Sequence, residues 1–362
     1  MIPWRKTKPD AAPPPSGDGH RYVFISGHPR SGTNWVSSLL NLHPDCFCDG
    51  EFHFQILRWA MDGFGSLPWY LGALEPQKSV AEQSFQQLVR NCLQERARVR
   101  LSALGRALPP VLGDHTPRVF RLMISPPEAR YIVLLRDGRD VLVSYTFHLL
   151  NAKAASVIPE QMCGFYQQQL ATLDGTHESQ RQAGIALLCH EPWVRYYANF
   201  WLEQILHDMR IWDAVASQGF GAYVKFVSYE QLRADVEGGR RDIYRHLGLD
   251  PEKAAPVSAQ TNTAPGFGGR EDVTSFYRKG EPGDWCRYFT AQNARWFQET
   301  AGEAMRVLGY EPDASWVDRL AATQSPEQIG TPIASITTPT NNHAAATNGV
   351  HVQTTDRVLT TH

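Results

Sequence analysis

The hydrophobic pattern of the chain predicts short strands that alternate with helices. Continuous apolar runs rich in Val, Ile, Leu and aromatic residues, typical of strands buried on both faces, occupy residues 21–26, 111–113, 130–135 and 222–228. Helical periodicity follows in residues 34–41, 139–150, 229–235 and 240–247, and longer amphipathic stretches cover residues 192–217 and 291–308. We therefore predict an α/β fold, with a three-layer α/β/α architecture around a central parallel sheet of about five strands.

The two ends of the chain lack this pattern. Residues 1–20 are Pro-rich, and residues 313–362 are mostly Thr- and Asn-rich with few aromatic side chains, so we expect both segments to be disordered. With 362 residues and a hydrophobic content of 42%, the chain can bury one large core in the part between these two end segments. We predict that residues 21–312 form a single domain.

Charge and cysteine content narrow the classes of function. A formal net charge of −2 argues against a nucleic-acid-binding protein. No apolar run has the length of a membrane span, so we expect no membrane anchor. The six cysteines are irregularly spaced, which favours unpaired thiols in a cytoplasmic protein over a disulfide framework or a metal site.

A candidate anion-binding loop lies in residues 24–35, which read as a buried strand, a turn of Gly and small polar residues, and the start of a helix. This order presents backbone N–H groups and a positive helix end to an anion. The spacing from Gly27 to Gly32 matches a P-loop, but Thr-Asn follows where that motif has Lys and then Ser or Thr. The cation stands at Arg30 instead. We interpret the segment as an anion loop that does not need a magnesium ligand, and we therefore predict that the three-layer fold is P-loop-like.

A second strand, turn and helix start occupies residues 131–144. Arg136 ends the strand and is expected at the carboxyl edge of the sheet, where open α/β sheets bind ligands. Ser144 follows about two helical turns later and could meet the same anion. The alternative is that Arg136 only pairs with Asp140 and that Ser144 is an ordinary helix residue.

A third segment, residues 276–285, places Arg278 and Lys279 next to Gly280. Two adjacent cations beside glycine form a flexible basic loop suited to a phosphate. Taken alone, this segment is better explained as a solvated surface turn.

Together, the three segments resemble the sulfotransferase family that uses 3′-phosphoadenosine 5′-phosphosulfate (PAPS), in the order in which that family has them, over roughly residues 20–310. The resemblance implies PAPS as the sulfuryl donor, PAP as the product, and no metal. It implies that the first loop holds the 5′-phosphosulfate and that the other two segments hold the 3′-phosphate. The implied donor-binding residues are Arg30, Ser31, Gly32, Thr33, Asn34, Trp35, Arg136, Ser144, Tyr229, Arg278, Lys279 and Gly280.

The resemblance also implies individual roles. Arg30 would contact the transferring sulfuryl group, at a position where the family often has Lys. Thr33 and Asn34 would contact the 5′-phosphate. Trp35 would stack on the adenine and Tyr229 would reach it, although ordinary core packing is a fair alternative for both aromatic residues.

The general base has two candidates. Glu51 follows the helix after the first loop, and its position resembles that of the catalytic Glu of the protein-tyrosine sulfotransferases. His115 follows a predicted strand end and resembles the catalytic His of the cytosolic small-molecule enzymes, or else replaces a Lys that other members have there. The alternatives are a solvated carboxylate and a His that merely caps a loop. Both candidates are expected to line the site, and the sequence leaves the choice between them open.

The resulting hypothesis is a sulfotransferase that moves the sulfuryl group of PAPS to a hydroxyl or amine by in-line displacement, with Arg30 and either Glu51 or His115 as catalytic residues. The acceptor would be a small molecule or a carbohydrate, and the choice between monomer and homodimer stays open. One rival is a P-loop kinase or NTPase, which the missing Lys disfavours. Another is a binding module that retains the nucleotide but has lost the base.

Overall fold

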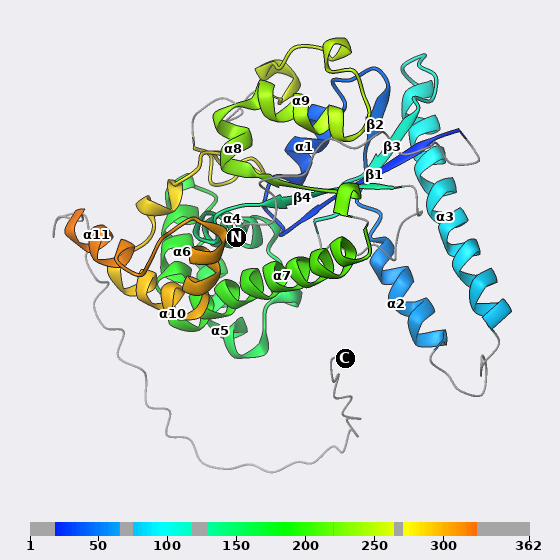
Figure 1. Ribbon diagram of the computed structural model, residues 1–362. Helices are drawn as coiled ribbons and strands as arrows, with labels where there is room; N and C mark the ends of the chain where they lie inside the picture. Colours follow the sequence, from blue (N-terminus) through cyan, green and yellow to red (C-terminus); the bar gives the residue numbers. More distant parts are fainter. Residues whose placement is uncertain (1–18, 66–74, 118–128, 220, 264–270, 324–362) are drawn as a thin grey trace. The chain divides into compact units, whose positions relative to one another are not determined.

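The computed structural model describes residues 19–65, 75–117, 129–219, 221–263 and 271–323 (Figure 1). Residues 1–18 of the predicted disordered N-terminal segment and residues 324–362 of the predicted tail therefore lie outside the described residues. The described residues belong to one compact unit that ends at Thr323. Within them, no helix is both long enough and apolar enough to cross a membrane.

Five parallel strands form the central sheet, which confirms the predicted fold class. The strands are β1 (Arg21–Gly27), β2 (Cys46–Cys48), β3 (Val111–Asp114), β4 (Arg130–Leu135) and β5 (Val224–Ser228). Their order is β2-β3-β1-β4-β5, and each neighbouring pair runs parallel. Gly27, the last residue of β1, pairs with Leu134 near the end of β4. The loops that follow these two strands therefore start side by side at the carboxyl edge of the sheet.

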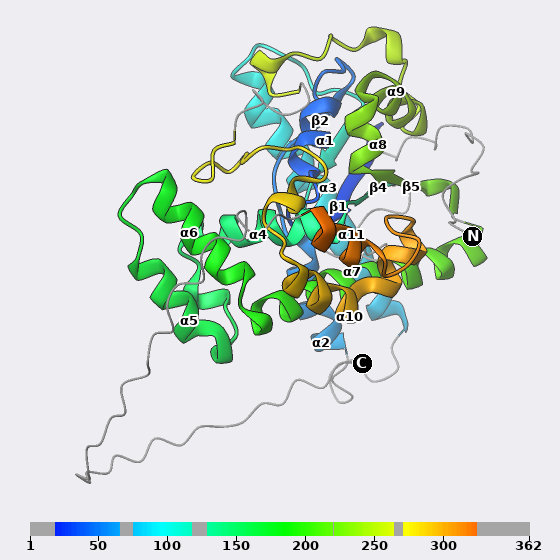
Figure 2. The same ribbon diagram turned by 90° about the vertical axis from the view of Figure 1, so that its left-hand side faces the viewer.

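Helices cover both faces of this sheet (Figures 1 and 2). Within the described residues, the α-helices are α1 (Thr33–Leu40), α2 (Phe54–Gly65), α3 (Glu75–Ser102), α4 (Gly138–Ala152), α5 (Glu160–Ala171), α6 (His177–Leu188), α7 (Glu191–Ser217), α8 (Tyr229–Ala234), α9 (Val236–His246), α10 (Ala291–Leu308) and α11 (Trp316–Thr323).

Alternate residues of β1 face two different hydrophobic cores. Val23 and Ile25 pack with α1, α8 and α9 on one face of the sheet. Tyr22 and Phe24 pack with α3 and the end of α7 on the other face. Because side chains of a strand alternate between faces, burial on both sides produces the continuous apolar run seen in the sequence. A third core joins α4, α5, α6, α7, α10 and α11.

Helix α10 begins and ends where the sequence pattern predicts. Thr290 and Asn293 form a capping box at its start, and Gly309 ends it in the left-handed region with φ 78°. Helix α11 follows, and its Trp316 ring lies 5.4 Å from that of Trp285. We predicted a domain boundary at residue 312, whereas compact packing continues through α11.

Candidate active site

The loop between β1 and α1 presents an uncapped helix end. The Ser31 N–H donates to the His28 carbonyl (2.9 Å), which tightens the turn after β1. Gly32 is the N-cap residue of α1 and has no side chain to satisfy the N–H groups of the first turn. That turn holds no acidic residue. The positive end of α1 is therefore available to an anion.

Glycine is required at position 32 by the geometry of this loop. Its φ of 107° lies where residues with a Cβ are strained. A Cβ at this position would also lie 2.8 Å from Cδ2 of Tyr229. Tyr229, at the start of α8, therefore packs directly against the loop backbone.

Gly32→Ala is expected to lower the free energy of unfolding by about 2 kcal/mol, because the new methyl group adds a clash to the backbone strain. Gly105→Ala is the matched control. Gly105 also has a positive φ (64°), but no heavy atom lies within 4 Å of its would-be Cβ, so this variant carries strain alone. Urea unfolding of both variants measures the difference. Equal losses in the two variants would contradict the predicted clash.

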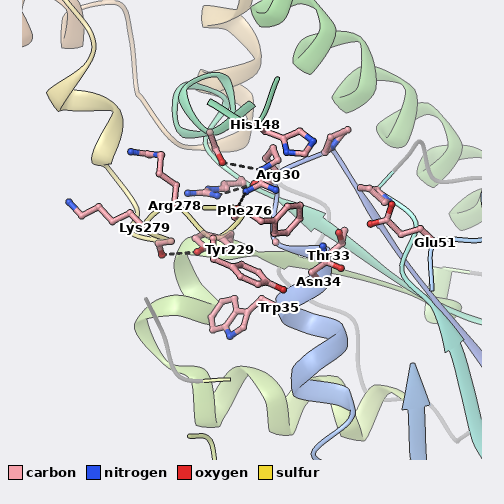
Figure 3. Close-up of a pocket in the computed structure, with 17 residues that line it drawn as sticks. Arg30, Thr33, Asn34, Trp35, Glu51, His148, Tyr229, Phe276, Arg278 and Lys279 are labelled. Atoms are coloured by element: carbon pink, nitrogen blue, oxygen red, sulfur yellow. Dashed lines mark hydrogen bonds between the residues drawn. The ribbon is translucent and has the colours of Figure 1, made fainter. Parts of the chain in front are cut away.

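A pocket of about 200 Å³ opens in front of this loop (Figure 3). Its walls come from the first loop, the β4–α4 segment, the start of α8 and the late segment at residues 276–280. The predicted site residues that line it are Arg30, Gly32, Thr33, Asn34, Trp35, Glu51, Arg136, Ser144, Tyr229, Arg278, Lys279 and Gly280. The structure therefore brings together every predicted site residue except Ser31 and His115.

Arg30 and Arg136 are the pocket cations that form no ion pair with any described residue. Arg30 donates from Nε to Ser144 Oγ (3.2 Å) and lies 4.2 Å from the Phe276 ring centroid. Arg136 donates to the Arg30 carbonyl (2.9 Å) and lies 4.2 Å from the Tyr229 ring centroid. The Nε of Arg136 is buried and has no hydrogen-bond partner among the described residues. This guanidinium therefore has a hydrogen-bond donor available for a ligand.

Burial and the neighbouring positive charges both act on the pKa of Arg30. Burial, together with the charges of Arg136 and Arg278, lowers the pKa of Arg30 to about 10. The group is still a cation at neutral pH. Arg136 is buried and Arg30 is partly buried, and the two repel each other and form no ion pair with a described residue, so the pocket favours a bound anion.

Arg278 and Lys279 also line the pocket but are already paired with carboxylates. Arg278 pairs with Glu271 and with Asp284 (2.6 Å). Lys279 pairs with Asp284 (3.0 Å) and Glu281 (3.1 Å). Figure 3 shows both side chains extending away from the first loop. Their ion pairs order the late segment, and their contact with a 3′-phosphate stays a prediction.

Helix α4 holds the late segment in place. The Asp140 carboxylate in its first turn accepts hydrogen bonds from the backbone N–H groups of Gly283 (2.7 Å) and Trp285 (2.9 Å). The sequence left open an ion pair between Arg136 and Asp140. The structure uses Asp140 for the two amides instead, which leaves the Arg136 side chain available to a ligand.

Trp35 and Tyr229 combine core packing with a place in the pocket wall. Their ring centroids are 5.4 Å apart in an edge-on arrangement. Trp35 donates from Nε1 to the Thr263 carbonyl (3.0 Å), and the Tyr229 hydroxyl donates to the Gly280 carbonyl (2.7 Å). Both side chains therefore pack in the core and also line the pocket, and the adenine contact stays a prediction.

The two candidate bases lie in different surroundings. Glu51 lines the pocket and its side chain is 37% exposed. His115 is buried and does not line the pocket, and among the described residues the charges of Asp49 and Arg96 act on it. Burial lowers the pKa of His115, and its Nδ1 has no hydrogen-bond partner among the described residues. The expectation that both candidates line the site is therefore met by Glu51 alone.

Ser31 is the other predicted residue that does not line the pocket. Its Oγ lies under the loop, 2.7 Å from where a Cβ on Gly27 would stand. Its backbone N–H is used in the turn to His28. Ser31 therefore shapes the loop from below rather than facing the pocket.

The pocket also contains residues that the sequence analysis did not assign to the site, namely Pro29, Pro117, His148, Phe276 and Tyr277. His148 follows Ser144 by one turn of α4, so the four-residue spacing on one helix face could have indicated it. Phe276 and Tyr277 directly precede the basic pair of the late segment.

His148→Phe is expected to flatten the loss of stability between pH 6.5 and pH 4. Burial and the charge of Arg30 lower the pKa of His148 from 6.5 to about 4. Between these pH values, His148 binds a proton in the unfolded chain but not in the folded protein. The contribution of neutral His148 to the free energy of unfolding is therefore complete above pH 6.5 and is lost toward pH 4. We expect about 1 kcal/mol at this half-buried, solvent-screened site. Urea unfolding at pH 7 and pH 4.5 measures the effect, and equal pH dependence in both proteins would contradict it.

The chain is thus a parallel α/β protein whose pocket, at the N-terminus of α1 and the carboxyl edge of the sheet, is suited to an anion. The family model described as the sulfotransferase domain matches residues 20–309. The chain therefore belongs to the sulfotransferase domain family. This match confirms the family and the enzyme class predicted from the three sequence segments.

Several solved structures are similar to the chain. One is mouse sulfotransferase SULT7A1 complexed with PAP, at 17% identity and a TM-score of 0.40, covering 84% of this chain and 89% of that one. Another is retinol dehydratase in complex with androsterone and the inactive cofactor PAP, at 18% identity and a TM-score of 0.36, covering 79% and 80%. A third is a sulfotransferase from Alicyclobacillus acidocaldarius, at 17% identity and a TM-score of 0.34, covering 82% and 100%. The family assignment rests on the family model and not on these similarities.

Proposed function

We propose that this sulfotransferase transfers the sulfuryl group of PAPS to a hydroxyl or amine of a small molecule or carbohydrate, without a metal ion. The observation that carries the proposal is the placement of Arg30 and Arg136, without ion pairs to described residues, beside the open N-terminus of α1. Buried cations of this kind are offset by bound anions. PAPS carries anionic groups at two places, the 5′-phosphosulfate and the 3′-phosphate.

The residues of the pocket fit this donor. The buried Arg136 Nε without a partner among the described residues suits the 3′-phosphate, together with the Ser144 hydroxyl. Arg30 and the first-turn N–H groups at Thr33 and Asn34 suit the 5′-phosphosulfate. Trp35 and Tyr229 would contact the adenine, and residues 278–280 would complete the 3′-phosphate site.

The proposed step needs few groups. The acceptor O–H or N–H gives its proton to the Glu51 carboxylate while the acceptor atom forms a new bond to sulfur. The bond between sulfur and the 5′-phosphate oxygen breaks in line, and its electron pair leaves with PAP. Arg30 and the α1 N–H groups balance the charge on the sulfuryl and bridging oxygens. Because the sulfuryl group carries less charge than a phosphoryl group, protein cations suffice in this scheme.

The choice of Glu51 over His115 follows from position. A general base must come within hydrogen-bond reach of the acceptor proton. Glu51 lines the pocket that Arg30 also lines, and His115 does not. We also propose a reducing compartment, the cytoplasm, since all six cysteines of the chain are described and are free thiols.

The test is incubation of the full chain with ³⁵S-labelled PAPS and an acceptor panel that contains 2-naphthol, a long-chain alcohol, an aryl amine and a disaccharide. We expect PAP and one sulfated product in equal amounts by mass spectrometry, with no loss of rate in EDTA. The calorimetric Kd for PAP is measured in parallel. Binding of PAP with no transfer to any acceptor, nor to those of a cell extract, would favour a binding module instead. Turnover of ATP with magnesium would favour a P-loop kinase or NTPase. Absence of PAP binding would overturn the assignment of PAPS as donor.

A further inference from the structure

The loop that carries Glu51 is joined to the segment after β3 by consecutive hydrogen bonds. The Asp49 N–H donates to the Gly113 carbonyl (3.3 Å), and the His115 N–H donates to the Gly50 carbonyl (3.2 Å). These two bonds continue the β2–β3 ladder past the end of β2. They fix the backbone directly before Glu51.

The backbone directly after Glu51 is fixed by the Asp114 side chain. Asp114 Oδ1 accepts from the Phe52 N–H (3.0 Å), and Oδ2 accepts from the Thr116 hydroxyl (2.7 Å). The Thr116 oxygen in turn accepts from the His53 N–H (3.4 Å). Asp114 itself is only 3% exposed. One buried carboxylate thus organises the whole turn.

The turn needs such support because its backbone is strained. Gly50 has a φ of 103°, and His53, a residue with a Cβ, has a φ of 51°. A non-glycine residue in the left-handed region costs of order 1 kcal/mol or more and persists only where contacts fix it. The backbone bonds with Gly113 and His115 supply those contacts before Glu51, and the bonds to Asp114 and Thr116 supply them after it.

Asp114 also acts on Glu51 through charge. Burial raises the pKa of Asp114 to about 6, with its hydrogen bonds to Thr116 and Phe52 opposing the rise and the nearby charge of Glu51 adding to it. Asp114 is therefore mostly ionised at neutral pH. Two neighbouring carboxylates disfavour each other's ionised form, so each binds a proton more readily.

Other charged groups of the described residues also lie around the turn. His53 Nε2 lies 3.7 Å from Glu51 Oε2. Asp49 points to α3, where it pairs with Arg96 (2.9 Å) and Arg100 (3.3 Å). Arg30 faces Glu51 from the first loop across the pocket. Because the charge of Asp49 is balanced by its own partners, Asp114 is the carboxylate of the described residues that we expect to act most on Glu51.

We propose that Asp114 is a positioning residue for Glu51, which holds the turn that delivers the Glu51 carboxylate to the pocket and, through its own charge, makes that carboxylate a stronger base. The inference rests on the proposed role of Glu51 as general base. Thr116 acts with Asp114 in this role, and we call the two residues the clamp.

Two measurements on the full chain test the clamp without any acceptor. Carbon-13 titration of Glu carboxyl groups, with the Glu51 signal assigned by its loss in Glu51→Gln, follows the charge effect. Amide hydrogen exchange at residues 50–53 follows the geometry. Asp114→Asn removes the charge and keeps the size, Thr116→Val removes the hydroxyl and keeps the charge of Asp114, and Thr116→Ser restores the hydroxyl. Asp49→Asn is the matched control in the same turn.

We expect Asp114→Asn to move the Glu51 titration to lower pH by about half a unit. We expect Thr116→Val to speed exchange of the Phe52 and His53 amides about tenfold, and Thr116→Ser to restore protection. Asp49→Asn should change neither readout.

An unchanged Glu51 titration in folded Asp114→Asn would overturn the inference. If that variant does not fold, unchanged exchange in Thr116→Val would overturn it. Full activity of Glu51→Gln would instead overturn the base assignment, while both clamp readouts stay interpretable because neither needs turnover.

Discussion

Replacing Glu51 by glutamine is expected to lower kcat by about 100- to 10,000-fold, the usual contribution of an oriented general base. Glutamine has nearly the same shape but cannot accept the acceptor proton. Because Glu51 lies apart from the cations that we assign to the donor phosphates, the Kd for PAP should stay within about twofold. Single-turnover transfer from labelled PAPS and calorimetry with PAP measure the two quantities separately.

His115→Asn is the informative comparison for this variant, because the sequence allowed either residue as base. His115 is buried away from the pocket, so we expect its loss to cost stability and to change kcat less than about tenfold. Asp49→Asn removes a carboxylate two residues from Glu51 whose partners are Arg96 and Arg100, and should leave kcat unchanged. A Glu51→Gln enzyme as fast as wild type, beside a His115→Asn enzyme that is inactive but folded, would reverse the assignment.

The strands could be predicted from the sequence because the sheet is buried on both faces. Four strands, β1, β3, β4 and β5, coincide with continuous apolar runs. The remaining strand, β2 (Cys46–Cys48), has three residues, which is too short for any periodicity to separate it from a loop. It nevertheless decides the position of Glu51, because the turn that follows it carries the carboxylate.

Helix α3 could not be predicted for a different reason. Its buried positions form a stripe one residue wide at a spacing of four, namely Phe85, Val89, Leu93, Ala97 and Leu101. The rest of the helix is mostly polar, so its amphipathic pattern is weaker than that of α10. Burial against the sheet and not local periodicity makes this segment a helix.

The candidate site was predictable where a motif fixes the backbone. The glycine and cation of the first loop, and the strand end at Arg136, follow from chain order and sheet topology. In contrast, the pairing partner of a side chain depends on residues that only the fold brings close to it. The sequence could not show that Arg278 pairs with Glu271 and Asp284. Nor could it show which candidate base reaches the pocket, since both follow elements at the same sheet edge.

Arg136→Ala is expected to raise the Kd for PAP about 100-fold, equivalent to about 3 kcal/mol for lost charge-assisted hydrogen bonds. In the free protein, the Arg136 guanidinium is held on the Tyr229 ring and by the Arg30 carbonyl, with Nε unused among the described residues. It is thus pre-organised for an anion. Arg136→Lys keeps the charge but loses the fork of donors, so an intermediate loss of about tenfold is expected.

Comparison of PAP with adenosine 5′-phosphate, which lacks the 3′-phosphate, separates the two roles that Arg136 has in the structure. If the guanidinium binds the 3′-phosphate, the Kd for adenosine 5′-phosphate divided by the Kd for PAP falls about 100-fold in Arg136→Ala. If it only supports the Arg30 carbonyl, both ligands lose affinity equally and the ratio is unchanged. Arg287→Ala is the matched control, since this cation just after the late segment pairs with Glu271 (3.1 Å) and Asp284 (3.3 Å) and does not line the pocket, so its loss should leave the ratio within about twofold. An unchanged ratio in Arg136→Ala would therefore contradict the assignment of Arg136 to the 3′-phosphate, which is the main support for PAPS as donor.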